Sequence, residues 1–167
     1  MSHVQTGIGL DLSVYTDSNY AEKADDRRSA SGVVVTLGNA TVGWICSKQR
    51  IVTLSTTEVD YVALGDGVKQ ALFAKSVASF LVPSLSQKTI MIFVDIDGAI
   101  KLVSNPLSSA RTKHIDVRFQ FVRELVSSGI IAVEYVPTNE QRTDIVTKAF
   151  VGPIFRELRD FLMNLHD

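Results

Sequence analysis

A nearly continuous apolar run from Thr89 to Val94, followed at once by Asp95, constrains the fold more than any other stretch. A run of this kind predicts a strand covered on both faces, as in a sheet flanked by helices. Sites in such sheets lie beyond the carboxyl ends of the strands, so Asp95 is a stronger candidate for a functional acid than an average surface carboxylate. Asp97 has the same strand parity and is the rival candidate.

Three β-rich runs precede this strand. Apolar and polar residues alternate from Ile8 to Tyr15, and a Gly-Asn hairpin signal separates Gly32–Leu37 from Val42–Ser47. These runs predict a three-stranded antiparallel meander. Trp44 and Cys46 share one face of the third strand, where we expect both to pack; Cys46 is the sole cysteine, and no disulfide framework is expected.

A long helix is predicted to follow the meander and to end near Leu81, because Pro83 stops it. Ser55 and Glu58 match a capping box, so Glu58 has a structural explanation as well as a functional one. The apolar positions expected to pack this helix on the sheet are Val62, Leu72, Phe73, Val77 and Phe80.

The second half of the chain continues the alternation of helices and strands. An amphipathic helix is predicted from about Arg111 to Val126, a last strand from Ile130 to Val136, and a further helix with Asp144 in its first turns. The helix dipole is a structural explanation for Asp144. We expect one domain over residues 1–167, with a core of about 8–150 and a C-terminal amphipathic helix over 151–167 that packs on the domain or on a partner.

Four acids therefore stand at predicted element ends: Asp17, Glu58, Asp95 and Asp144. Acids brought together raise one another's pKa, so such a cluster implies a bound cation. Hard oxygen ligands favour Mg²⁺ or Mn²⁺. The sequence thus predicts a metal site made of carboxylates.

Charge and hydropathy restrict the context in which this site works. A net charge of -1 and a pI near 6.3 argue against a protein that holds nucleic acid by electrostatics alone. Neither an apolar run long enough for a membrane span nor a signal-peptide pattern is present, so we expect no membrane contact. The expected location is the cytoplasm, with the nucleus as the alternative.

Four motifs in fixed order carry a resemblance to a known family. Asp25–Gly32, Leu54–Tyr61, Ala110–Arg118 and Thr143–Lys148 resemble the RNase H domain of copia-like retrotransposon polyproteins, and the likeness runs from about residue 12 to residue 150. The resemblance implies an RNase H-like α/β fold: a five-stranded mixed sheet, three antiparallel strands with two parallel additions, flanked by helices. It also implies a virus-like particle as the setting within a retroelement.

By this resemblance, Asp17, Glu58, Asp95 and Asp144 take the positions of the family's four metal-binding and catalytic carboxylates. They would hold two Mg²⁺ ions, for which Mn²⁺ can substitute, and hydrolyse the RNA strand of RNA/DNA hybrids. A reverse transcriptase domain in the parent polyprotein is the expected partner. The chain departs from the family at Ile96-Asp97, where polar neutral residues are usual.

Position and charge suggest backbone contacts to the hybrid from Ser18, Asn19, Lys48, Arg111, Lys113 and His114. For the basic start of the 111–126 helix, an ordinary solvated face is the alternative.

Two other functions stay open. One is a domesticated or degenerate module that binds nucleic acid or protein without cutting. The other is a different nuclease of the same fold, such as a transposase or a junction resolvase.

Overall fold

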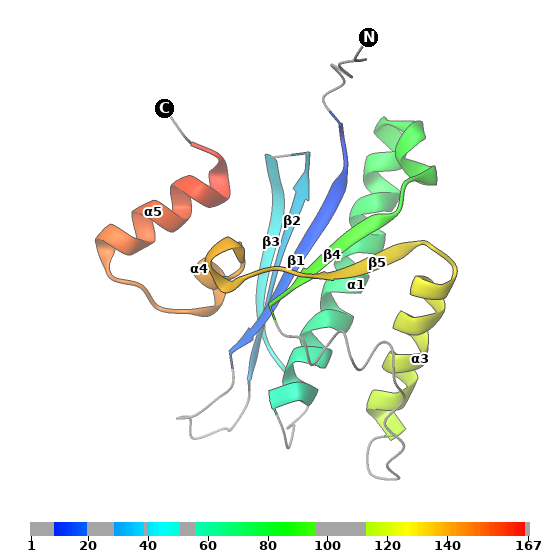
Figure 1. Ribbon diagram of the computed structural model, residues 1–167, viewed down its shortest axis with the longest axis horizontal. Helices are drawn as coiled ribbons and strands as arrows, with labels where there is room; N and C mark the ends of the chain where they lie inside the picture. Colours follow the sequence, from blue (N-terminus) through cyan, green and yellow to red (C-terminus); the bar gives the residue numbers. More distant parts are fainter. Residues whose placement is uncertain (1–8, 20–28, 39, 51–55, 96–112, 166–167) are drawn as a thin grey trace.

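The computed structural model describes residues 9–19, 29–38, 40–50, 56–95 and 113–165, which form a five-stranded sheet with helices on both faces (Figure 1). In spatial order, its strands are β3 (Ala40–Lys48), β2 (Ala30–Leu37), β1 (Leu12–Asn19), β4 (Ile90–Val94) and β5 (Ile131–Tyr135). The first three strands pair antiparallel, and β4 and β5 add in parallel to β1. The predicted sheet is confirmed.

The β2–β3 turn uses a residue that tolerates left-handed backbone, because Gly38 has a φ of 59°. The pairing of β1 with β2 continues past Asp17, which lies opposite Gly32, as far as Asn19. Asp17 therefore lies inside β1, two residues before its end, rather than just beyond it. The polar residues at the end of β1 belong to the strand because they pair with residues of β2.

Two long helices cover one face of the sheet, and two shorter helices lie on the other (Figure 1). The long helices are α1 (Thr56–Leu81) and α3 (Lys113–Ser127); the shorter ones are α4 (Asp144–Thr147) and α5 (Gly152–Met163). Short 3-10 turns are η1 (Pro83–Gln87) and η2 (Thr138–Glu140). The predicted end of the first helix is confirmed, whereas the helix that carries Asp144 is a single turn and begins at that residue.

The hydrophobic core lies between the sheet and the two long helices. It is formed by alternate residues of the inner strands, by one side of α1 and by Val122 of α3; its buried members include Leu12, Val14, Ile90, Ile92, Tyr61, Leu64 and Val68. A Cβ at Gly67 would collide with the Thr16 side chain of β1. Glycine at this point lets α1 lie close to the strand that carries Asp17.

Several apolar side chains that we expected to pack are exposed instead. Trp44 is 60% exposed, and Phe73 and Phe80 of α1 are 67% and 87% exposed. Cys46 is also exposed. The reason is that β3 is an edge strand, and α1 turns a different side to the core.

The C-terminal helix packs on the domain, as one of the two expectations had it. Leu162 of α5 is buried, and its carbonyl oxygen accepts a hydrogen bond from the Thr41 hydroxyl of β3. The predicted start of the preceding long helix at Arg111 lies outside the described residues, as do Ser55, Ile96 and Asp97. Within the described part of the chain, no helix is both long and apolar enough to cross a membrane.

Candidate active site

The parallel pairing of β1 with β4 brings two acids to the same edge of the sheet. The register places Thr16 opposite Val94, so the next residues, Asp17 and Asp95, follow on neighbouring strands. Asp17 is buried and Asp95 is half-buried. The fold therefore holds two carboxylates side by side that are 78 positions apart in the chain, counting from 17 to 95.

The single turn of α4 adds a third acid and a cation. Asp144 begins α4, and its Oδ1 lies 2.7 Å from the Lys148 Nζ. The Thr147 hydroxyl donates to Asp17 Oδ2 at 2.7 Å, and the Asn19 side-chain amide donates to the Thr147 carbonyl at 3.0 Å. These bonds fix α4 against the end of β1.

The acids of this edge influence one another electrostatically. Burial, then the charge of Asp17, raises the pKa of Asp95 to about 6, and Asp144 adds to the rise. Burial is also the main cause that raises the pKa of Asp17, which the Thr147 hydrogen bond and the charge of Lys148 oppose. Asp17 and Asp95 are therefore harder to ionise than an aspartic acid in water.

A fourth acid, Asp60 of α1, joins them, and the sequence reasoning missed it. The Ser18 hydroxyl donates to Asp60 Oδ1, while Asp60 Oδ2 is buried without a hydrogen-bond partner. Burial is the first cause that raises its pKa to about 6, and the charges of Asp95 and Asp17 raise it further. We call Asp17, Asp60, Asp95 and Asp144 the acid cluster.

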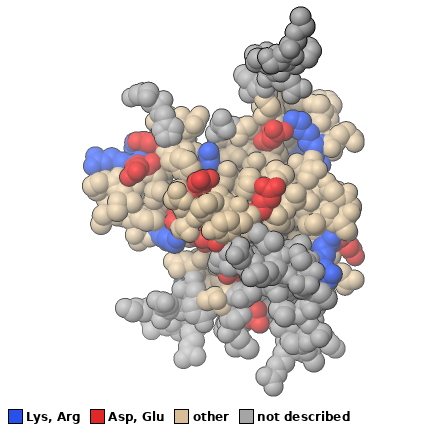
Figure 2. All heavy atoms as spheres, in the orientation of Figure 1, with Lys and Arg blue, Asp and Glu red and all other residues tan. Residues whose placement is uncertain are grey.

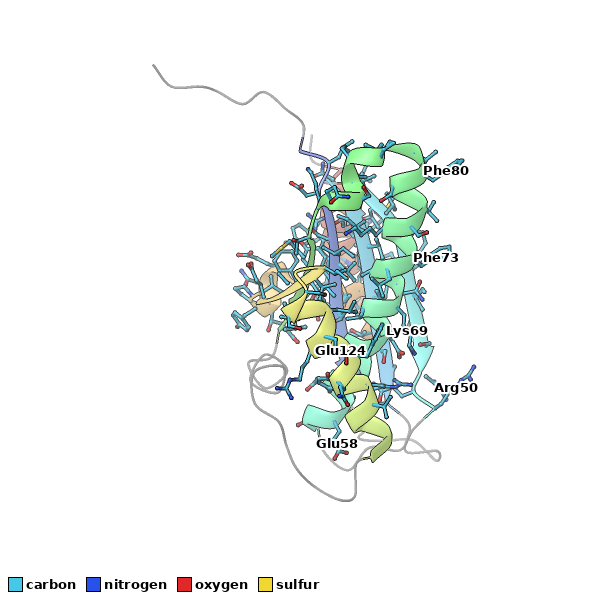
Figure 3. The ribbon with its side chains drawn as sticks, turned by 90° about the vertical axis from the view of Figure 1, so that its right-hand side faces the viewer. Arg50, Glu58, Lys69, Phe73, Phe80 and Glu124 are labelled. Carbon is cyan, nitrogen blue, oxygen red and sulfur yellow. The ribbon has the colours of Figure 1, made fainter. Side chains whose placement is uncertain are left out.

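Helix geometry explains why Asp60, rather than Glu58, faces the cluster. Successive residues of an α-helix are about 100° apart, so these two side chains leave α1 about 200° apart. Asp60 shares its side of α1 with Gly67, which abuts β1. Glu58 shares its side with Val62 and Lys69, on the flank that Figure 3 shows. The structure thus brings Asp17, Asp95 and Asp144 together and places Glu58 elsewhere, in the first turn of α1.

Pol polyproteins of plant transposons match nearly the whole chain in sequence. It is 36% identical over 155 residues to the retrovirus-related Pol polyprotein from transposon TNT 1-94 of Nicotiana tabacum, covering 93% of this chain and 11% of the relative. It is 33% identical over 145 residues to the Pol polyprotein from transposon RE2 of Arabidopsis thaliana, covering 87% and 10%. The chain therefore spans about a tenth of the length of these relatives. No protein-family model matches it.

Solved structures show the same fold at low sequence identity. The N-terminal RNase H domain of a Mycobacterium tuberculosis protein superposes with a TM-score of 0.58 at 13% identity, over 90% of this chain and 97% of that chain. RNase H1 from Halobacterium salinarum gives a TM-score of 0.55 at 16% identity, over 82% and 93%. The chain is a homologue of copia-like Pol polyproteins and has the RNase H fold.

The acid cluster of this RNase H-like domain suits a hard cation. All its donors are carboxylate oxygens, and the buried Asp60 Oδ2 has no hydrogen-bond partner. Among the described residues, however, no three Asp, Glu, His or Cys side chains are placed closely enough to hold a metal ion as they stand. The chemistry of the donors fits Mg²⁺ or Mn²⁺.

Basic side chains gather on a different flank of the domain. A groove of about 400 Å³ between the end of β3, α1 and α3 is lined by Lys48, Arg50, Lys69 and Arg118, with Asp66 among them. We call it the basic groove; Figure 3 shows Arg50 and Lys69 on this flank. On the face shown in Figure 2, by contrast, the described lysines and arginines are scattered among acids.

The basic groove holds a partly unsatisfied cation. Arg118 Nη1 is buried without a hydrogen-bond partner and lies 3.7 Å from Asp66 Oδ1. The Arg118 side chain as a whole is 30% exposed, so its accessible part offers positive charge to an anionic ligand in the groove. The basic groove is therefore a candidate site for an anionic ligand.

The six predicted substrate contacts have different positions in the structure. Lys48 lines the basic groove, whereas Ser18 and Asn19 support the acid cluster through their hydrogen bonds to Asp60 and Thr147. Arg111 lies outside the described residues, and so do the side chains of Lys113 and His114, although both residues begin α3.

Proposed function

We propose that the chain is a metal-dependent endoribonuclease that hydrolyses the RNA strand of RNA/DNA hybrids during reverse transcription of a retroelement. One observation carries the proposal: acids from β1, β4, α4 and α1 converge at one edge of an RNase H fold. A scaffold without such chemistry gains nothing from holding four mutually repelling carboxylates together.

Asp17, Asp60, Asp95 and Asp144 are the residues that would hold the divalent ions, with Glu58 as the earlier candidate for the position of Asp60. Bound Mg²⁺ or Mn²⁺ would supply an activated water and charge neutralisation at the scissile phosphate. Asp17 is the most buried of the four and lies among the other three, so it would hold the metal together with each of its neighbours.

The remaining residues of the site orient these acids and the substrate. Thr147 and Ser18 hold Asp17 and Asp60 by donating hydrogen bonds to them. Burial raises the pKa of both Asp17 and Asp95, and the Lys148 ammonium opposes that rise, which favours the ionised form that binds a cation. The basic groove would hold backbone phosphates of the hybrid, and 2′-hydroxyls in its minor groove would distinguish RNA from DNA.

Solved relatives of the fold support this substrate class. LC11-RNase H1 has been solved in complex with an RNA/DNA hybrid, and superposes with a TM-score of 0.55 at 13% identity over 80% of this chain and 91% of that chain. A foamy viral protease-reverse transcriptase has also been solved with a hybrid, at a TM-score of 0.53 and 14% identity, over 78% and 18%. For this chain we propose a reverse transcriptase of the same polyprotein as partner, and a cytoplasmic virus-like particle as location.

The test is cleavage of an end-labelled RNA/DNA hybrid by the full chain in Mg²⁺ and then in Mn²⁺. Wild-type protein should cut the RNA strand, and Asp95→Asn should not. Asp11→Asn is the matched control, because Asp11 is an exposed acid that pairs with Lys88 outside the cluster. Equal cutting by wild type and Asp95→Asn would remove Asp95 from the site.

A hybrid-binding module without cleavage is the second candidate. The observation in its favour is that the described acids do not approach one another closely enough to hold a metal as they stand. Folded wild-type protein that binds the hybrid in a gel-shift assay but cuts neither strand in either metal would establish this alternative. Cutting of double-stranded DNA instead would point to another nuclease of the fold.

A further inference from the structure

A second groove on the flank of α1 is apolar and open. It has a volume of about 330 Å³ and lies between β3 and the second half of α1. Trp44 and Ile45 line it from β3, and Phe73, Val77 and Leu81 from α1. We call this the apolar groove; Figure 3 shows Phe73 pointing outward on the flank of α1.

The exposure of these side chains is unusual for a surface that contacts only solvent. Trp44, Phe73 and Leu81 are 60%, 67% and 73% exposed. Phe73, Val77 and Leu81 are spaced four residues apart and form one stripe along the helix. Large contiguous apolar patches on soluble domains mark interaction sites.

The stripe gives α1 a second apolar side. Its first side, which includes Leu64 and Val68, is buried in the core. A helix with two apolar sides is typical of one that is packed between two bodies. No described residue of α3 or α5 lines the groove, so neither of these helices supplies the second body.

The position of the groove indicates which body this is. Leu12, the first residue of β1, is among the residues that line it, so the start of β1 lies at the groove. In the TNT 1-94 relative, the segment that matches 93% of this chain makes up 11% of the polyprotein, so the relative has much additional chain. A segment that precedes β1 in the same polyprotein needs little linker to reach this site.

We propose that the apolar groove docks an apolar-faced segment of the reverse transcriptase of the same Pol polyprotein, an inference that rests on the proposed function. The apolar groove continues into the basic groove, because Val33, Ile45 and Gln70 line both. A reverse transcriptase seated on the apolar groove therefore lies beside the proposed backbone site. Docking would align a hybrid held by the polymerase with the basic groove.

The experiment measures binding between the full chain and the reverse transcriptase segment of the same reading frame, expressed separately, by titration calorimetry. Phe73→Ser/Leu81→Ser and Trp44→Ser remove apolar surface from the two walls, and each should weaken binding by about tenfold or more. Val117→Ser is the matched control, because Val117 is 71% exposed on α3 and does not line the groove. It should bind as wild type does.

Hybrid cleavage, measured on the same proteins, separates this proposal from the proposed function. If the protein cleaves the hybrid but the groove variants bind the reverse transcriptase as tightly as wild type, the docking proposal alone is overturned. A reading frame that encodes no reverse transcriptase would also overturn it. Binding that depends on the groove, without cleavage, would overturn the nuclease alone. A concentration-dependent dimer that Phe73→Ser/Leu81→Ser abolishes, seen by sedimentation without the polymerase, would assign the groove to a second copy and overturn the proposal.

Discussion

The acid cluster buries charged side chains, whereas the apolar groove exposes large apolar ones; folded proteins usually do the reverse in both cases. In the cluster, charged groups are buried without enough partners, as the lone Asp60 Oδ2 shows. In the groove, large apolar side chains such as Phe73 face solvent. Both arrangements are unfavourable in the isolated domain, and each becomes favourable when the missing partner binds. The interaction that each region lacks indicates its partner. The carboxylates lack a cation, and the apolar surface lacks a protein to pack against it.

One helix connects the two regions. Asp60 leaves α1 toward the cluster, while Phe73 leaves it about 220° away, counting about 100° for each residue. Substitutions in the two regions should therefore separate two functions. Changes to the cluster should remove cleavage and leave polymerase docking intact, and changes to the apolar groove should do the reverse.

The largest expected effect tests which acid of α1 belongs to the cluster. Asp60→Asn should lower hybrid cleavage roughly 100-fold or more, because it removes one carboxylate ligand and leaves the fold intact. Glu58→Gln, two residues away on the other flank, should change cleavage by less than about threefold. Single-turnover cleavage rates at saturating Mg²⁺ measure both. A large loss in Glu58→Gln with little change in Asp60→Asn would restore Glu58 as the ligand.

A smaller effect is expected in the basic groove, which touches substrate but not the reacting atoms. Arg118→Met should raise the dissociation constant for the hybrid about threefold to tenfold and reduce the slope of log K against log salt by about one phosphate contact. The rate at saturating hybrid should stay the same. Arg159→Met, a change at an exposed arginine of α5 that pairs with Asp160, is the control. An unchanged salt slope in Arg118→Met would place the hybrid elsewhere.

Most of the fold could be predicted because its signals are local. The apolar run before Asp95, the Gly-Asn turn and Pro83 each act within a few residues, and each marked an element or a boundary that the structure confirms. The exposure of Phe73 could not be predicted, because an apolar stripe on a helix indicates burial without saying what buries it. That depends on which elements pack beside α1, a tertiary property.

The candidate site was predictable in part for the same reason. Asp17 and Asp95 follow from the rule that sites lie at strand ends, although β1 extends past Asp17. Asp60 was missed because the family resemblance was used to assign the carboxylate of this helix to Glu58, two residues earlier. The signal that could have found it is helical phase: Asp60 shares a side with Leu64 and Gly67, which face the sheet. The metal, and the role of each acid, stay predictions.

The smallest expected effect concerns the stability of the metal-free protein. The folded pKa values of Asp60 and Asp95 are raised from 3.8 to about 6, so the folded state binds more protons than the unfolded state between those values. The free energy of unfolding should therefore fall as pH rises from 5 to 7. Allowing for solvent screening, the loss is about 1 kcal/mol, or roughly 2–4 °C in Tm.

Thermal unfolding in EDTA at pH 5 and pH 7 measures this loss. The same measurement with Mg²⁺ shows whether the ionised acids bind a cation. Asp60→Asn should lose part of the difference between the two pH values, because it removes one of the two most perturbed carboxylates, whereas Glu58→Gln should keep it. Mg²⁺ should raise the Tm more at pH 7, where the cluster is ionised, than at pH 5. A Tm that is the same at both pH values would mean that neither burial nor mutual repulsion raises the pKa values of Asp60 and Asp95, and the argument for a bound cation would lose its physical basis.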